Sequence, residues 1–426
     1  MSASGRYGET TARIASVFAF WLVALFAAVI WVAPATATDN PIILTESGFL
    51  QGIVGAQVNQ YLGIPYAAPP VGALRWLPPK PFGRWQGVFQ ATQFGSECPQ
   101  TGGGNENCLF LNIYTPAPNH EIRRRGRAVM VWIHGGGLTA GAGSEFDPTP
   151  LVEGGHVIVV TINYRLGMLG FFAQTALDTE GHLAGNYGFM DQQLALRWVR
   201  RNIAAFGGDP ERVTIFGESA GGLSIYSELA SPLAAGLYHR AIAQSGAYAG
   251  FSDNRVQILP IAVAATTGNP IVESGAALAD AVGCSSQTTA CLRAVPAATL
   301  VAAQGATFPT IDGVLLTETP GEAFKSGNFN RVPVITGTNH DEYRYFVATN
   351  FTLPVDNSQY ANAFATVFGP GQAPVVPPTE GVDPGPTRSC WHSPREEVLC
   401  PLSTPAASRL LNACRAGVDV ISTPRA

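Results

Sequence analysis

The residue in this chain best placed for covalent chemistry is Ser219. It is the centre of GESAG (residues 217–221), in which glycines stand two residues before and two residues after it. The preceding residues, VTIF, favour a buried strand, and a helix is expected to begin directly after the serine. A sharp strand-to-helix turn forces the serine into a strained backbone conformation and exposes its hydroxyl. The helix N-terminus favours developing negative charge. This context predicts a nucleophilic serine rather than a chance turn residue.

A glycine-rich segment, HGGG at residues 134–137, follows another apolar run. Glycines allow backbone N–H groups to turn inward without a Cβ clash. We expect two of these amides, together with the N–H of Ala220, to bind the oxyanion of a tetrahedral intermediate. His134 itself is interpreted as a residue that positions the loop and not as a base.

The elements that must position these groups belong to an α/β fold. Continuous apolar runs predict five buried parallel strands, at residues 129–134, 157–164, 213–219, 240–246 and 332–339. Met190, Leu194 and Trp198 recur at roughly helical spacing, and GGDP at residues 207–210 ends that helix. Alternating strands and helices predict a mostly parallel central sheet with helices on both faces.

Composition and the N-terminus indicate a folded, exported protein. The chain has 426 residues, of which 46% are apolar and 13% charged, and its net charge of -5 does not suggest nucleic acid as a partner. Arg6 and Arg13 precede an apolar run at residues 14–33, and small residues follow at Ala35 and Ala37. This order predicts a signal peptide at residues 1–37 and a secreted or cell-envelope location. An uncleaved anchor is the alternative, and only then is a membrane partner expected.

Export also permits disulfides. There are seven cysteines, so at least one is unpaired within a monomer. Four of them form two close pairs, and loops closed by Cys98–Cys108 and by Cys284–Cys291 are the simplest pairing. The other three, Cys390, Cys400 and Cys414, lie near the end of the chain.

Several longer segments, some of which contain these motifs, resemble segments of a known family. They include YLGIPYAAPPVGALRW (61–76), ENCLFLNIYTP (106–116), VWIHGGG, VTINYRLGMLGFF, VTIFGESAGG, AIAQSGA and VPVITGTNHDEYRYF, in this order along the chain. Together they resemble the type-B carboxylesterase family, which includes bacterial para-nitrobenzyl esterases and the cholinesterases. The resemblance runs from about residue 41 to about residue 368.

The resemblance implies an α/β-hydrolase fold and hydrolysis of small-molecule carboxylic esters through a Ser-Glu-His triad. Carried over residue by residue, Ser219 is the nucleophile and Glu342 is the triad acid. Gly136, Gly137 and Ala220 supply the oxyanion-hole amides. No metal or organic cofactor is implied.

Architectural residues of the family are matched as well. Cys98–Cys108 and Cys284–Cys291 correspond to its disulfides, while Arg165 and Asp191 correspond to a structural ion pair. The loop between Cys98 and Cys108 departs from the cholinesterases, because it lacks the aromatic residue that binds choline there. A general esterase is therefore favoured over a choline-ester specialist.

The C-terminal part departs most. The hydrolase domain is predicted at residues 38–369, and residues 370–426 form a proline-rich tail interpreted as disordered or as the product of a truncation or reading-frame change. His392 is the only histidine after Glu342, and it lies in this tail without the family's surrounding motif. We expect an incomplete C-terminal part and an impaired esterase unless His392 reaches Ser219. A catalytically silent, cholinesterase-like binding protein is the alternative; the persistence of Ser219, HGGG and Glu342 favours the esterase.

Overall fold

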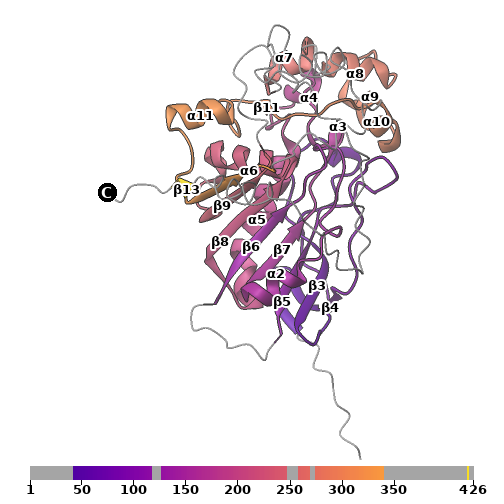
Figure 1. Cartoon of the computed structure of the whole chain (residues 1–426). Coiled ribbons are helices and arrows are strands. Elements are labelled where there is room, and N and C mark those ends of the chain that lie inside the picture. Colours follow the sequence, from indigo (N-terminus) through magenta and orange to yellow (C-terminus); the bar gives the residue numbers. More distant parts are fainter. Residues whose placement is uncertain (1–41, 118–125, 247–257, 269–273, 340–419, 422–426) are drawn as a thin grey trace, which may run out of the picture. The chain divides into compact units, whose positions relative to one another are not determined.

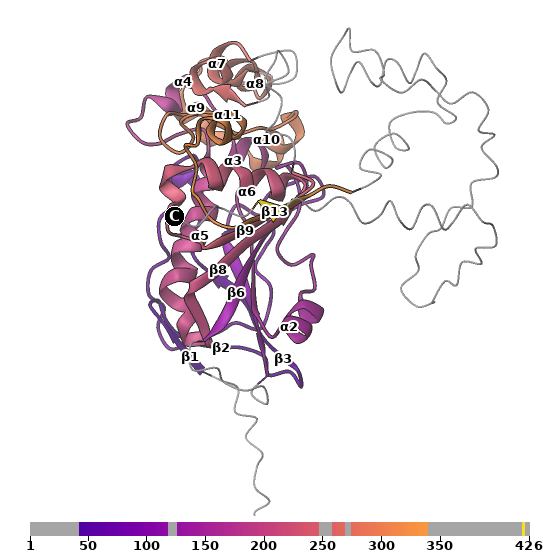
Figure 2. The ribbon, with the colours of Figure 1, turned by 60° about the vertical axis from the view of Figure 1, so that its left-hand side comes forward.

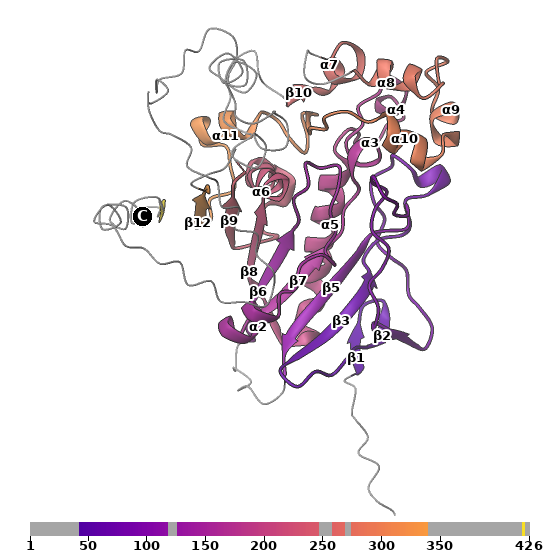
Figure 3. The same cartoon turned by 45° about the vertical axis from the view of Figure 1, so that its right-hand side comes forward.

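The computed structural model describes residues 42–117, 126–246, 258–268, 274–339 and 420–421. Its large sheet contains strands β3 (Val58–Pro65), β5 (Phe110–Pro116), β6 (Arg127–Ile133), β7 (Ile158–Ile162), β8 (Gly208–Glu218), β9 (Arg240–Gln244), β12 (Val334–Gly337) and β13 (Val420–Ile421). The strand order is β13-β12-β9-β8-β6-β7-β5-β3, and most of it can be followed in Figure 3. Two smaller sheets contain β1 (Ile42–Thr45), β2 (Gly48–Gln51) and β4 (Val88–Gln90), and β10 (Leu259–Pro260) and β11 (Thr310–Ile311).

Helices connect and flank these strands. They are α2 (Thr149–Gly155), α3 (Gly167–Gly170), α4 (Thr175–Asp178), α5 (Tyr187–Asn202), α6 (Ala220–Ala230), α7 (Ile261–Thr266), α8 (Gly275–Ala281), α9 (Thr289–Ala294), α10 (Ala297–Ala303) and α11 (Pro320–Ser326). Three short 3₁₀ helices are η1 (Gly72–Leu74), η2 (Ile203–Phe206) and η3 (Pro232–Ala234). Helix α5 lies on one side of the large sheet and α2 on the other (Figure 2).

The five strands predicted from apolar runs are all present, and they pair in parallel as β7-β6-β8-β9-β12. The sheet is mixed, because β3, β5 and β13 pair antiparallel to their neighbours. The α/β-hydrolase fold class predicted from the sequence is therefore confirmed. Strand β13 lies in the proline-rich tail, where its short run gave no usable sequence signal.

Burial explains why apolar runs marked the central strands. Every residue of β7 is buried, so both of its faces are covered. In β6 burial alternates: Val129, Val131 and Ile133 are fully buried, whereas Met130 and Trp132 are only partly so. These strands and α5 share one large apolar core.

The parallel strands end at the edge of the sheet where ligands bind in open α/β folds. Helices α3, α4 and α7 to α10 gather beyond that edge (Figure 1).

Two disulfides are present, Cys98–Cys108 and Cys284–Cys291. The remaining three cysteines lie outside the described residues, as does the predicted signal peptide. Within the part of the chain that is described, no helix has the length and apolar character needed to cross a bilayer.

Candidate active site

Ser219 occupies a sharp turn between β8 and α6. Its torsions are φ 55° and ψ −121°, and α6 begins at the next residue, Ala220. A non-glycine residue in such a region carries strain of about 1–3 kcal/mol, so its surroundings must hold it in place. The Ser219 N–H donates to the Gln244 carbonyl (2.9 Å), and the Leu223 N–H donates to the Ser219 carbonyl (2.9 Å). The strained strand-to-helix turn expected from the sequence is therefore present.

The glycines around Ser219 are required because backbones cross there. A Cβ added to Gly221 would lie 2.1 Å from the Ile133 carbonyl oxygen at the end of β6. A Cβ on Gly217 would lie 2.7 Å from the same oxygen, and one on Gly222 would lie 2.7 Å from the Gln244 oxygen. Side chains at these positions would force β6, β9 and α6 away from the turn.

The glycine-rich segment after β6, residues 134–137, lies against this turn. A Cβ on Gly135 would lie 3.2 Å from the Cβ of Ser219. Gly136 and Gly137 have φ of 90° and 63°, values that favour glycine. The structure thus brings together the serine and the glycine loop, two sites separated by about eighty residues of sequence.

Buried contacts fix the conformation of this loop. The Tyr164 hydroxyl donates to the His134 carbonyl (2.8 Å), and the Gly167 N–H donates to the Leu138 carbonyl (2.7 Å). Leu138 is 1% exposed and has a φ of 61°, so the chain turns sharply just after Gly137. Sequence reasoning missed these contacts, because no spacing rule links the loop to the residues after β7.

The surroundings of His134 suit a residue that positions the loop and not one that transfers a proton. Its ring is buried and stacks on Tyr164 with a centroid distance of 4.4 Å. Its Nδ1 lies 2.9 Å from the Gly135 carbonyl oxygen, which requires a proton on Nδ1. Burial lowers the pKa of His134 to about 4, so the ring is neutral near pH 7. This agrees with the role inferred from its position.

The proposed acid and base, Glu342 and His392, lie outside the described residues. The strand that leads toward Glu342 is described: β12 pairs in parallel with β9, and the Ser245 N–H donates to the Gly337 carbonyl (2.8 Å). Gln244, which holds Ser219, is the neighbour of Ser245. The chain therefore leaves the sheet toward Glu342 from the same edge that carries the serine.

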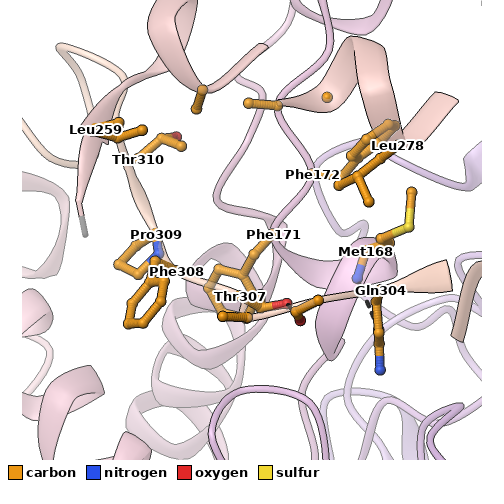
Figure 4. A pocket seen from close by; sticks show the side chains of 15 residues that line it. Met168, Phe171, Phe172, Leu259, Leu278, Gln304, Thr307, Phe308, Pro309 and Thr310 are labelled. Carbon is orange, nitrogen blue, oxygen red and sulfur yellow. Dashed lines mark hydrogen bonds between the residues drawn. The ribbon is translucent and has the colours of Figure 1, made fainter. Parts of the chain in front are cut away.

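An apolar pocket lies beyond this edge, between α3 and the residues before β11 (Figure 4). Met168 and Phe172 line it from the α3 region with Leu278 beside Phe172, and Phe308 and Pro309 line the opposite side. Gln304, one of its polar side chains, accepts a hydrogen bond from the Met168 N–H (3.2 Å). Because Gly167 ties this same helix to Leu138, the pocket wall is continuous with the glycine loop.

The described residues contain no group of three or more His, Cys, Asp and Glu side chains suited to a metal ion. Glu180 and His182 do approach one another (3.0 Å), but Arg293 engages the same carboxylate at 2.6 Å. These side chains form an ion-paired cluster.

The model of the carboxylesterase family matches residues 39–368. The chain belongs to the carboxylesterase family. The match covers nearly the same residues as the domain predicted from the sequence.

Individual members of the carboxylesterase family resemble this chain over most of its length. A cocaine esterase of Oryctolagus cuniculus is 39% identical over 336 residues, covering 72% of this chain and 60% of that protein. A fumonisin B1 esterase of Sphingopyxis macrogoltabida is 37% identical over 377 residues, covering 84% and 66%. The solved structure of a PNB esterase is 35% identical with a TM-score of 0.65, covering 78% of this chain and 70% of that one. This chain therefore spans about 60% of the length of the cocaine esterase it matches.

The ion pair expected from the carboxylesterase resemblance is formed. Arg165 Nε donates to Asp191 Oδ2 and Arg165 Nη2 donates to Asp191 Oδ1, both at 2.8 Å. Both side chains are almost fully buried, and the Arg165 guanidinium lies 5.2 Å from the Tyr187 ring centroid. The pair joins α5 to the segment after β7, so its role is architectural.

Proposed function

We propose that this chain is a carboxylic ester hydrolase in which Ser219 is the nucleophile. The observation that carries the proposal is the packing of the glycine loop against a strained serine at the carboxyl end of β8. A serine hydroxyl beside preorganised backbone amides is the arrangement that acyl transfer requires. Membership of the carboxylesterase family and esterase relatives at 37–39% identity support the same activity.

The proposed reaction has two steps. Ser219 attacks the ester carbonyl, and the amides of Gly136, Gly137 and Ala220 stabilise the oxyanion of the tetrahedral intermediate. The alcohol leaves, and water then hydrolyses the acyl-enzyme. A histidine oriented by Glu342 takes the serine proton and returns it to the leaving alcohol. His392 follows Glu342 in the sequence and is the proposed base, so the proposed mechanism requires that it reach Ser219.

The test uses the full chain with a short-chain p-nitrophenyl ester and a fluorophosphonate probe. We expect slow hydrolysis and labelling at Ser219, both abolished in Ser219→Ala, because loss of a triad residue costs about 10⁴–10⁶-fold in kcat. His392→Ala should change little. Fast turnover abolished by His392→Ala would overturn our interpretation of the tail. A wild-type chain that neither hydrolyses nor labels refutes the esterase and favours a silent binding protein.

We also propose that the protein is exported and that residues 1–37 are removed. The two disulfides of the described residues are compatible with an oxidising compartment. N-terminal sequencing of the mature protein should begin at residue 38. A mature chain that begins at residue 1 and sediments with membranes would support the uncleaved anchor instead.

A further inference from the structure

Gln100, in the disulfide loop between Cys98 and Cys108, is hydrogen-bonded to Gly141, four residues after the glycine loop of residues 134–137. Its amide nitrogen donates to the Gly141 carbonyl (3.2 Å), and its amide oxygen accepts from the Gly141 N–H (2.8 Å). The two residues are 41 positions apart in the sequence. One side chain thus satisfies both backbone groups of Gly141, as a neighbouring strand would.

The disulfide loop itself holds Gln100 in position. Backbone hydrogen bonds join Gln100 and Gly103 in both directions, at 2.9 and 3.1 Å. Gly104 packs so tightly that a Cβ there would lie 2.3 Å from the Cys98 carbonyl oxygen. With Cys98 bonded to Cys108, the turn that carries Gln100 is closed at its base.

Gly141 in turn supports the residues beside Ser219. A Cβ on Gly141 would lie 2.5 Å from His134 Nδ1 and 3.1 Å from the Gly135 carbonyl oxygen. The preceding residue, Ala140, donates its N–H to the Gly136 carbonyl (3.0 Å). Residues 140–141 are therefore the backing against which residues 134–136 rest.

We propose that Gln100 is a positioning residue for the oxyanion-binding loop, and that the Cys98–Cys108 disulfide serves catalysis by presenting it. The inference rests on the proposed function for its catalytic consequence. Glycine-rich backbone has many accessible conformations, so its amides stabilise an oxyanion well only if other groups fix them beforehand. The bonds to Gly141 are such a constraint.

A second residue, Asn163, should limit the structural change when the Gln100 side chain is removed. Asn163, which is 5% exposed, donates to the carbonyls of Ser96 and Cys108 (3.1 Å each) and accepts from the Gly143 N–H (2.8 Å). Gly143, which lies beyond the glycine loop, therefore stays attached to the disulfide region through Asn163. Loss of Gln100 should loosen residues 139–141 without unfolding the site.

Two variants test the proposal. Gln100→Ala removes both hydrogen bonds, while Gln100→Glu keeps the side-chain length but places an oxygen against the Gly141 carbonyl. For a p-nitrophenyl ester we expect both to lower kcat by about tenfold to a hundredfold, because displacement of about 1 Å has that effect. KM should stay within about twofold, because the oxyanion exists only in the transition state. Wild-type kcat in either variant would refute the role of the paired hydrogen bonds.

The matched control is Gln287→Ala. Gln287 lies within the other disulfide loop and makes side-chain hydrogen bonds to the Ala276 carbonyl, Asp280 and Gln174. None of these partners touches the glycine loop, so kcat should be unchanged. An equal loss of kcat in Gln287→Ala would show that disturbing either disulfide loop slows the protein, which contradicts a specific role for Gln100.

Hydrogen exchange gives a readout that does not need turnover. The amides of Thr139, Ala140 and Gly141 are hydrogen-bonded in the structure, and we expect them to exchange faster in full-length Gln100→Ala than in the wild type. Residues 284–294 should exchange as in the wild type. If the wild type neither hydrolyses nor labels, the proposed function fails, yet this measurement still decides whether Gln100 fixes the loop. Unchanged exchange at residues 139–141 would refute it.

Discussion

The substitution Gly135→Ala tests the packing of the glycine loop against the serine. Gly135 has a negative φ, so alanine adds a methyl group without backbone strain. That methyl would lie 2.8 Å from the Glu218 carbonyl oxygen and 3.2 Å from the Ser219 Cβ. To reach ordinary van der Waals contact, the loop must retreat from the turn by about 0.5 Å. Because displacement of about 1 Å can cost a factor of about 100, we expect a loss of about tenfold in kcat, or about 1.4 kcal/mol.

The assay measures kcat and KM for a short-chain p-nitrophenyl ester and the second-order rate of fluorophosphonate labelling. Both the kcat and the labelling rate should fall, since both reactions form a tetrahedral centre on Ser219. Gly154→Ala is the control: it lies in α2, and a Cβ there meets nothing within 4 Å. Its rates should match the wild type. If Gly135→Ala also reacts at the wild-type rates, the apposition of loop and serine has no catalytic consequence and our reasoning fails.

Three further variants test buried charges and a disulfide. Burial raises the pKa of Glu228 to about 8. The native state therefore keeps a proton that the unfolded chain loses above about pH 4.5. The free energy of unfolding should fall as pH rises between these two values. In thermal melts, the stability of Glu228→Gln relative to the wild type should rise as pH increases across that interval. Below the interval the two proteins should be equally stable. Asp191→Asn leaves Arg165 buried without its counter-charge and should lower the free energy of unfolding by about 3–5 kcal/mol in a denaturant titration. Replacing Cys98 and Cys108 by serine should cost about 2–4 kcal/mol of stability and lower kcat more than removing the other disulfide does.

The central strands could be predicted because strands that are buried on both faces appear in the sequence as continuous apolar runs. A strand covered on both faces, such as β7, must be apolar throughout, and short β-branched runs mark it. Strand ends were less predictable. Strand β8 begins at Gly208, five residues before the predicted start at Val213, because Gly208 pairs with Arg127 across an irregular register. Residues GGDP look like a turn locally, and only the neighbouring strand makes them part of the sheet.

The meeting of the glycine loop with Ser219 was also within reach of sequence reasoning. Both follow parallel strands, β6 and β8, which are neighbours in the sheet and end at the same edge. The contacts that hold the loop could not be predicted from the sequence. An amide such as that of Gln100, bonded to a backbone 41 residues away, follows no periodicity and belongs to no motif. Only the folded arrangement of the chain brings such residues together.

The proposed site has two parts. One is the serine with the glycine loop, and the other is the acid with the base. Ser219 is held by β9 and α6, and the glycine loop is supported by Tyr164, Gly167 and Gln100, so these supports of the proposed nucleophile and oxyanion donors come from described residues. The proposed acid and base, Glu342 and His392, lie outside the described residues. A chain that lacks a competent histidine should therefore keep the oxyanion-binding half intact. In serine hydrolases this half alone retains about 10³–10⁴-fold acceleration over water. If the tail supplies no base, the wild type should show this residual rate and Gly135→Ala should lower it further, whereas His392→Ala should leave it unchanged.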